Sequence, residues 1–298
     1  MDQPHEHGTG SDAAEDPEAL ARALSAAGYL ADDGLATAGF LAMRLGRPLF
    51  LEGEPGVGKT AFAQAMAAAT GSTLIRLQCY EGLDVTQALY DWDFPRQILH
   101  LRAMEAAGER IDEAGLYDRR FLIARPLLQA LEASPCVLLV DEIDRADDEF
   151  EAFLLEILSD AAVTIPELGR IAASTPPLAV LTSNRTREVH DALKRRCIYH
   201  WVEHPSFERE VEILHLRLPG ITDQLALDVA TAVARMRDAD LLKPPGVAES
   251  IDWAAALSVL GARTLDPDRA AATLGSVLKY REDADRIRAK GLAALLDA

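Results

Sequence analysis

One stretch of the chain constrains its fold more than any other: residues 49–60 read LFLEGEPGVGKT. The pattern G-x-x-x-x-G-K-[ST] is complete, and it stands directly between a short apolar run and an Ala-rich stretch at residues 61–69. A strand, a tight turn and a helix are the context in which this pattern forms a phosphate-binding loop. A chance glycine loop is the alternative, but the flanking segments favour a nucleoside-triphosphate site. The predicted loop residues are Gly53, Glu54, Pro55, Gly56, Val57, Gly58, Lys59 and Thr60.

The residue types of this loop supply the chemistry. Gly53, Gly56 and Gly58 allow the backbone to curl so that its N–H groups point inward, and the following helix adds partial positive charge. Lys59 provides a compact cation for the β- and γ-phosphates, and the Thr60 hydroxyl is a ligand for Mg²⁺. The predicted ligands are therefore a nucleoside triphosphate and Mg²⁺.

A second diagnostic stretch runs from Cys136 to Glu142, with the sequence CVLLVDE. A fully apolar run that ends in two carboxylates is typical of a central parallel strand with acids at its carboxyl end. Strands that end in solvated acids are common, but the phosphate loop upstream favours a functional pair. We expect Asp141 to contribute to the Mg²⁺ site and Glu142 to orient the attacking water.

A third strand is predicted at Leu178–Thr182, followed by Ser183, Asn184 and Arg185. The uncharged amide of Asn184 can hold the lytic water near the γ-phosphate, and a turn or helix-capping role is the alternative. Strands are also expected at Leu49–Glu52, Ser72–Cys79 and Cys197–Val202.

The remaining sequence divides the chain into three parts. Residues 1–16 are acidic and lack periodicity, which predicts a disordered tail. Residues 17–204 form the predicted nucleotide-binding domain, with a turn-rich insertion at 84–125, helical spacing at Leu116–Ala133 and a hairpin at Val163–Ala173. Residues 205–298 show helical patterns only, broken by Pro- and Gly-containing turns.

Composition limits the kinds of partner and the cellular setting that the chain can have. The net charge of −18 and the sequence pI near 4.8 argue against a nucleic-acid backbone as the main partner. No apolar run approaches the roughly 18–20 residues of a membrane span. Cys79, Cys136 and Cys197 are widely spaced, which predicts reduced core thiols in a cytoplasmic protein. A metal site of Cys197, His200 and His204 is disfavoured, since residues 197 and 200 of a strand point to opposite faces.

The order of these parts resembles the AAA+ ATPases, and within them the MoxR family. The segments that carry the resemblance are RPLFLEGEPGVGKT, VLLVDEIDRADDEFEAFLLEILSD, VTIPELG and VLTSNRTREVHDALKRRC. Two further segments, LQCYEGLDVTQALYDWDFPRQ and KPPGVAESIDWA, are similar to the CoxD-like branch. The resemblance implies an α/β fold: an AAA+ P-loop NTPase core, with a five-stranded parallel sheet of order 5-1-4-3-2, and a C-terminal α-helical lid.

The resemblance also implies roles for single residues. Lys59 and Thr60 would form the first nucleotide motif, Asp141 and Glu142 the second, and Asn184 the first sensor. The arginine finger, which acts on the neighbouring subunit's γ-phosphate, falls best on Arg196, with Arg195 as the alternative. A finger in trans implies a ring, and the family implies a homo-hexamer.

One departure from the family concerns the lid. Many relatives carry a second-sensor arginine where this chain has Val247-Ala248-Glu249-Ser250-Ile251. Either another cation, such as Lys243 or Arg263, takes that role, or the lid reports the nucleotide state weakly.

The function implied by the resemblance is ATP hydrolysis that remodels or activates a client metalloenzyme, together with a von Willebrand factor A domain partner. For the CoxD-like branch, the client would be a molybdenum–copper carbon monoxide dehydrogenase. The alternatives are a nucleic-acid-linked motor or GTPase, and an assembly scaffold with negligible turnover. The loop at Tyr80-Glu81-Gly82 is a candidate pore element, with core packing of Tyr80 as the alternative.

Overall fold

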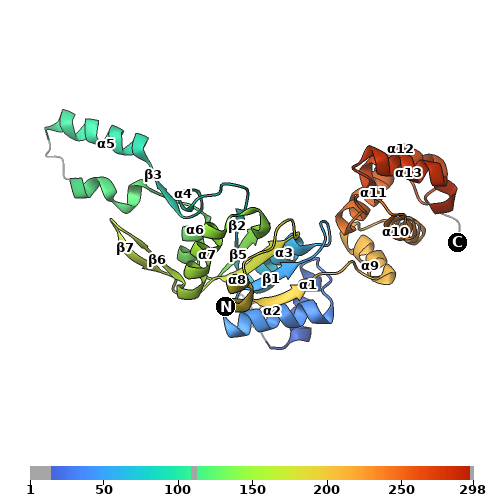
Figure 1. Cartoon of the computed structure of the whole chain (residues 1–298), viewed down its shortest axis with the longest axis horizontal. Coiled ribbons are helices and arrows are strands. Elements are labelled where there is room, and N and C mark those ends of the chain that lie inside the picture. Colours follow the sequence, from blue (N-terminus) through green and yellow to red (C-terminus); the bar gives the residue numbers. More distant parts are fainter. Residues whose placement is uncertain (1–14, 109–112, 296–298) are drawn as a thin grey trace, which may run out of the picture. The chain divides into compact units, whose positions relative to one another are not determined.

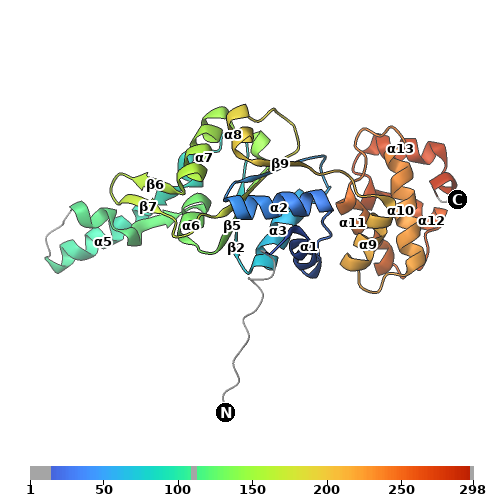
Figure 2. The same ribbon diagram turned by 90° about the horizontal axis from the view of Figure 1, so that it is seen from below.

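The computed structural model describes residues 15–108 and 113–295 (Figures 1 and 2). The predicted acidic tail therefore lies outside the described residues, except for residues 15 and 16. Contacts divide the chain into two compact units, which are described separately. Of the described residues, the first unit contains 15–27, 31–52, 60–108 and 113–200, and the second contains 28–30, 53–59 and 201–295. The domain limits predicted from sequence stay a prediction.

The first unit is built on a five-stranded sheet of order β2-β5-β8-β1-β9 (Figure 1). Counted along the chain, these strands have the predicted order 5-1-4-3-2, so the predicted α/β fold is confirmed. The β2–β5, β5–β8 and β8–β1 pairs are parallel, and all six residues of β5 are buried. The strands are β1 Leu49–Glu52, β2 Thr73–Gln78, β5 Cys136–Asp141, β8 Leu178–Ser183 and β9 Ile198–Trp201.

Short polar signals set the helix ends of this unit. Asp16, Asp32 and Asp147 accept hydrogen bonds from the first turns of α1, α2 and α7, respectively, and Gly46 ends α2 in the left-handed conformation. One hydrophobic cluster joins α6 and α7 to the inner strands, with Leu128, Phe150 and Leu138 among its members. The helices are α1 Pro17–Ala26, α2 Asp33–Leu45, α3 Lys59–Thr70, α6 Pro126–Glu132, α7 Asp148–Asp160 and α8 Asp191–Arg196.

The insertion between β2 and β5 differs from the sequence prediction. Helical spacing predicted one helix over 116–133, but Leu122–Ala124 is strand β4, paired antiparallel with β3 at Tyr90–Trp92. The helix begins only at Pro126, because Arg125 is extended and proline is favoured in a first helical turn. The insertion also contains α4 Val85–Ala88, α5 Phe94–Ala107 and 3₁₀ turns at Glu113–Tyr117 and Arg119–Phe121.

The predicted hairpin is confirmed. Strands β6 (Ala162–Ile165) and β7 (Gly169–Ala172) pair antiparallel beside α6 and α7 (Figures 1 and 2).

After Trp201, the described residues of the second unit form helices and turns, as predicted. Their core is centred on the fully buried Trp253, whose Nε1 donates to Thr273 Oγ1 at 2.7 Å. The helices are α9 Phe207–Arg217, α10 Asp223–Arg237, α11 Val247–Val259, α12 Pro267–Val277 and α13 Arg281–Lys290, followed by a 3₁₀ turn at Leu292–Leu295. None of the helices within residues 15–108 and 113–295 is long and apolar enough to cross a membrane.

Candidate active site

Asp141 is a buried acid at the centre of the hydrogen bonds of the candidate site. It ends the buried strand β5, and its side chain is 4% exposed. Its Oδ1 accepts hydrogen bonds from Thr182 Oγ1 at 2.6 Å and Thr60 Oγ1 at 3.0 Å. Its Oδ2 accepts from Arg76 Nη2 at 2.6 Å. Parallel strands bring their carboxyl ends to one edge of the sheet, so Asp141 on β5 meets Thr182 on β8 and Arg76 on β2 there.

Glu142 leaves the strand in the left-handed conformation, with φ of 56°. Its backbone N–H donates to Thr182 Oγ1 at 2.9 Å. Its carboxylate accepts from Asn184 Nδ2 at 3.4 Å and from Gln78 Nε2 at 3.1 Å, and it pairs with Arg145 Nε at 3.1 Å. The structure therefore brings Glu142 and Asn184 together, although 42 residues separate them.

Asp144 holds the turn that carries Asn184. This buried carboxylate accepts from the Asn184 backbone N–H at 3.3 Å, and from the N–H and hydroxyl of Thr186 at 2.9 and 2.6 Å. The amide of Asn184 thus lies beside Glu142 because a buried acid after β5 fixes the loop after β8.

The phosphate loop, residues 53–59, belongs to the second unit by its contacts, although it is bounded along the chain by Glu52 of β1 and Thr60 of α3. Gly56 and Gly58 have φ values of +81° and +99°, a conformation that L side chains rarely adopt. The local sequence therefore fixes the curled loop geometry.

Lys59 is buried at the start of α3, at 6% exposure. Its Nζ donates to the carbonyl oxygens of Gly53 and Glu54 at 2.7 and 2.8 Å. The ammonium group is thereby held on the concave side of its own loop.

The lid helix α11 begins directly against this loop, within the second unit. The Ala248 N–H donates to Gly56 O at 3.2 Å, and a Cβ on Gly246 would lie only 2.8 Å from Gly56 Cα. Glu249 Oε2 accepts from the Gly246 N–H at 3.0 Å and would lie 2.7 Å from a Cβ on Gly56. An acid, Glu249, therefore lies beside the loop at the segment where the sequence resemblance led us to look for an arginine.

Arg237 is a cation of the lid that the sequence did not single out. Its Nε donates to Pro245 O at 2.8 Å, and its other nitrogens form a bidentate pair with the buried Glu210 at 2.6 and 2.9 Å. Ser250 Oγ donates to the same carboxylate at 2.5 Å. This network fixes the turn before α11. The predicted substitutes Lys243 and Arg263 stay predictions.

Arg195 and Arg196 end α8 and are both exposed. Arg196 Nη1 donates to Ser159 Oγ at 2.8 Å, and Arg195 pairs with Asp191 at 3.5 Å. Their backbone carbonyls accept from the guanidinium of Arg47, which holds the end of this helix in place.

Tyr80 lies on the loop after β2 and is 44% exposed. Its hydroxyl donates to Gln87 Oε1 at 3.0 Å. The alternative that Tyr80 packs in the core is therefore wrong.

The three cysteines are buried and free. Burial, with added repulsion from Asp141, raises the pKa of Cys79 to about 12, and burial raises the pKa of Cys197 to about 12 and that of Cys136 to about 11. Cys197 Sγ donates to Leu193 O at 3.1 Å. These thiols stay protonated at neutral pH and act as small core residues.

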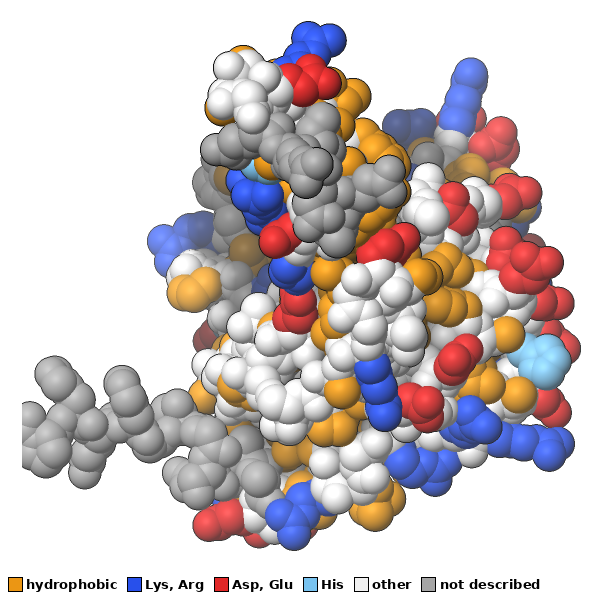
Figure 3. Space-filling view, turned by 90° about the vertical axis from the view of Figure 1, so that its left-hand side faces the viewer, with side chains coloured by type: hydrophobic (Ala, Val, Ile, Leu, Met, Phe, Trp, Pro, Cys, Tyr) orange, Lys and Arg blue, Asp and Glu red, His pale blue; other side chains and the backbone are white. Residues whose placement is uncertain are grey.

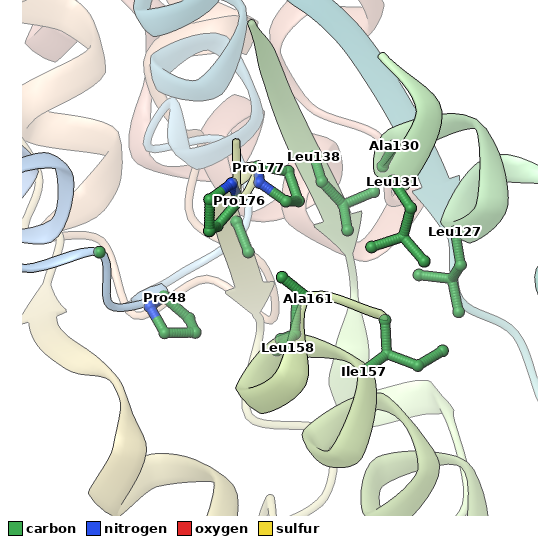
Figure 4. Close-up of a pocket in the computed structure, with 12 residues that line it drawn as sticks. Pro48, Leu127, Ala130, Leu131, Leu138, Ile157, Leu158, Ala161, Pro176 and Pro177 are labelled. Atoms are coloured by element: carbon green, nitrogen blue, oxygen red, sulfur yellow. The ribbon is translucent and has the colours of Figure 1, made fainter. Parts of the chain in front are cut away.

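A pocket of the first unit lies at the opposite end of the strands (Figure 4). Pro48 directly precedes β1, Pro176 and Pro177 directly precede β8, and helices α6 and α7 supply the other side. All of its lining residues are Gly, Ala, Pro, Leu or Ile, so it offers no acid–base chemistry.

Sequence reasoning missed Arg76, Gln78, Thr182 and Arg145 at this site. Arg76 and Gln78 are two residues apart on β2, so their side chains lie on the same face of the strand. This spacing of two polar residues was the one signal in the sequence that could have indicated their role. Their partners, however, depend on the β2–β5 register, in which Gln78 lies opposite Asp141.

Comparison with known proteins identifies the family of the segment that carries this site. Residues 48–197 match the AAA domain (dynein-related subfamily) family. The chain belongs to this family, which is a class of ATP hydrolases with the AAA+ P-loop NTPase core.

The individual curated proteins that the chain resembles share only a modest fraction of its sequence. The chain is 26% identical to Lon protease 2 of Myxococcus xanthus over 276 residues, covering 82% of this chain and 30% of that protein. It is 31% identical over 160 residues to the uncharacterized protein YehL of Escherichia coli (strain K12), covering 51% of this chain and 40% of that protein. The chain thus spans less than half the length of these curated relatives.

Among solved structures, the RuvB Holliday junction branch migration motor of Thermotoga maritima has a TM-score of 0.46 and 18% identity, covering 86% of this chain and 68% of that one. A likeness of this degree says nothing about function.

Proposed function

We propose that this protein is a MoxR-type AAA+ ATPase that hydrolyses ATP to remodel or activate a client metalloenzyme. The observation that carries the proposal is the convergence of Thr60, Asp141, Glu142 and Asn184 at the carboxyl edge of the sheet. These residues supply a hydroxyl, two carboxylates and an amide, the groups that phosphoryl transfer to water requires.

The donor set fits Mg²⁺. The Thr60 hydroxyl and the Asp141 carboxylate are hard oxygen ligands within 3.0 Å of each other, and Mg²⁺ takes one or two protein oxygens together with water and phosphate. Thr60 and Asp141 would hold the ion, which would supply positive charge to neutralise the phosphates. Lys59 adds a further positive charge from the phosphate loop.

Glu142 would orient the water that attacks the γ-phosphorus in line with the departing ADP oxygen. Its carboxylate accepts a hydrogen bond from that water, and Asn184 beside it offers a neutral donor. Gln78 and Arg145 limit the rotamers of the carboxylate.

The ring is part of the same proposal. Arg196 and Arg195 are exposed at the end of α8, where a neighbouring subunit has access to them. We assign the finger to Arg196, which donates to the neutral Ser159 hydroxyl, whereas the alternative, Arg195, is paired with the Asp191 carboxylate. A homo-hexamer would complete each site with an arginine in trans.

Exposed apolar side chains of the insertion support a protein client. Phe94, Ile98 and Leu99 of α5 are 58%, 51% and 67% exposed, and Tyr117 and Ile123 nearby are 41% and 39% exposed. Figure 3 looks onto the side of the first unit that carries this insertion and shows hydrophobic side chains at the surface among charged ones. Exposed apolar groups of this kind mark contacts with other proteins.

The finer assignments rest on the sequence resemblance alone. They are the CoxD-like branch, a molybdenum–copper carbon monoxide dehydrogenase as client and a von Willebrand factor A domain protein as partner. A cytoplasmic location is proposed on the three free cysteines.

Two variants test the core of the proposal by calorimetric ATP titration and phosphate release. Lys59→Ala should lose ATP binding, because the loop loses its buried cation. Glu142→Gln should bind ATP with Mg²⁺ as wild type does but release phosphate at least about 10²-fold more slowly, because the neutral amide is a poorer acceptor for the water. Unimpaired turnover by Glu142→Gln would remove this residue from the mechanism.

A further inference from the structure

Strand β2 contributes two polar side chains that reach the two acids of the site. Arg76 Nη2 donates to Asp141 Oδ2 at 2.6 Å, and Gln78 Nε2 donates to Glu142 Oε2 at 3.1 Å. Arg76 Nη2 also donates to Gln78 Oε1 at 2.6 Å. The four side chains thus form one continuous chain of hydrogen bonds from the proposed metal ligand to the proposed water-orienting acid.

Arg76 differs from the other partners of Asp141 in its charge. Thr60 and Thr182 are neutral hydroxyls that both donate to Oδ1, with Thr60 Oγ1 also 3.3 Å from Oδ2, whereas Arg76 is a cation that donates to Oδ2 at 2.6 Å. The Asp141 side chain is 4% exposed, so the guanidinium, itself 52% exposed, acts on an acid that water scarcely reaches. Charge-assisted bonds of this kind are stronger than neutral ones.

From these contacts we infer that Arg76 is a positioning residue that sets the Mg²⁺ requirement of the enzyme. Its guanidinium balances part of the Asp141 charge, which lowers the affinity of the site for a divalent cation, and its bond to Gln78 holds Glu142 in place. The inference rests on the proposed function, in which Asp141 contributes to the Mg²⁺ site.

The sign of the expected effect follows from how Asp141 is held. Loss of Arg76 leaves two hydroxyls on Oδ1, so the carboxylate keeps its orientation from α3 and β8. The substitution removes a unit positive charge beside Asp141. It therefore also removes the Coulomb repulsion between that charge and a divalent cation, so the affinity for Mg²⁺ should rise. A residue with a merely structural role would, when replaced, leave Mg²⁺ affinity unchanged or weaken it.

The test measures binding of a non-hydrolysable ATP analogue by intrinsic tryptophan fluorescence at a saturating analogue concentration and graded Mg²⁺. In Arg76→Met, which keeps the side-chain length but not the charge, the half-saturating Mg²⁺ concentration should fall about tenfold, or about 1.4 kcal/mol. Arg76→Lys keeps the charge and should restore the wild-type value. The kcat of Arg76→Met should also fall at least about fivefold, because Gln78 loses its anchor and Glu142 is held less firmly.

Arg119→Met is the matched control, because it removes another half-exposed arginine from an ion pair, with Glu132 at 2.5 Å, outside this chain of hydrogen bonds. It should leave the Mg²⁺ midpoint unchanged. Suppose the wild type shows Mg²⁺-dependent binding and the half-saturating Mg²⁺ concentration of Arg76→Met is unchanged or higher. That result would overturn this inference but leave the proposed function intact. A wild-type protein whose analogue binding ignores Mg²⁺ would overturn the metal site of the proposed function and this inference with it.

Discussion

Thr182 offers a direct way to test the site through the stability of the fold. Its hydroxyl donates to Asp141 Oδ1 at 2.6 Å and accepts from the Glu142 N–H at 2.9 Å, and the residue is 1% exposed. Thr182→Val replaces the hydroxyl by a methyl group of nearly the same size. The substitution therefore removes two hydrogen bonds without opening a cavity.

The expected cost follows from those two contacts. A hydrogen bond to a charged group contributes roughly 1.5–3 kcal/mol, and a buried donor left unsatisfied costs roughly 1–3 kcal/mol. Asp141 keeps Thr60 and Arg76, so the lower end of the sum, about 2.5 kcal/mol, is expected for Thr182→Val. For a domain of this size, that corresponds to a fall in melting temperature of roughly 5–10 °C.

Thr182→Ser is the matched control. It keeps the hydroxyl and loses one methyl group, which costs roughly 1 kcal/mol. Thermal unfolding followed by circular dichroism, with phosphate release at 25 °C, measures both variants. We expect the Val protein to melt clearly below the Ser protein and to lose turnover, because the backbone of Glu142 loses its anchor. If the two proteins melt within about 2 °C of each other, the bridging role of this hydroxyl is refuted.

Two further predictions concern subunit and client contacts. Arg196→Ala should bind ATP and fold normally but hydrolyse it roughly 10³–10⁵-fold more slowly, and mixing it with Lys59→Ala protein should recover activity in phosphate-release assays. No recovery despite demonstrated subunit exchange would exclude Arg196 as a finger in trans. Tyr80→Ala should keep basal ATPase activity and melting temperature, because the ring is 44% exposed, while stimulation by a client protein is lost. A matching loss of melting temperature would instead assign Tyr80 a structural role.

Local sequence was sufficient where a structural element is determined by its own residues. The run Cys136–Asp141 is apolar throughout, and it forms a strand whose six residues are all buried. Gly56 and Gly58 of the phosphate loop adopt positive φ, as the turn requires. Such elements need no knowledge of distant partners.

The sequence predictions were wrong or incomplete where the structure of a segment depends on residues far away in the chain. Leu122–Ala124 has helical spacing with its neighbours, yet it pairs with Tyr90–Trp92, and no local pattern shows that pairing. Arg76 likewise looks like a solvated residue of an edge strand. Its contact with Asp141 depends on a register between segments 65 positions apart.

The start of α11 shows how a departure from a family pattern can be explained in physical terms. Gly246 and Gly56 approach so closely that a Cβ on Gly246 would lie 2.8 Å from Gly56 Cα, a separation that real Cβ atoms do not show. The backbone of the lid helix therefore lies directly on the phosphate loop, and Ala248 donates to Gly56 O. The turn before α11 is held by Arg237, which donates to Pro245 O and pairs with Glu210. In this second unit, a direct steric contact therefore links the loop to α11 at residues 247–251, where the sequence resemblance led us to look for an arginine.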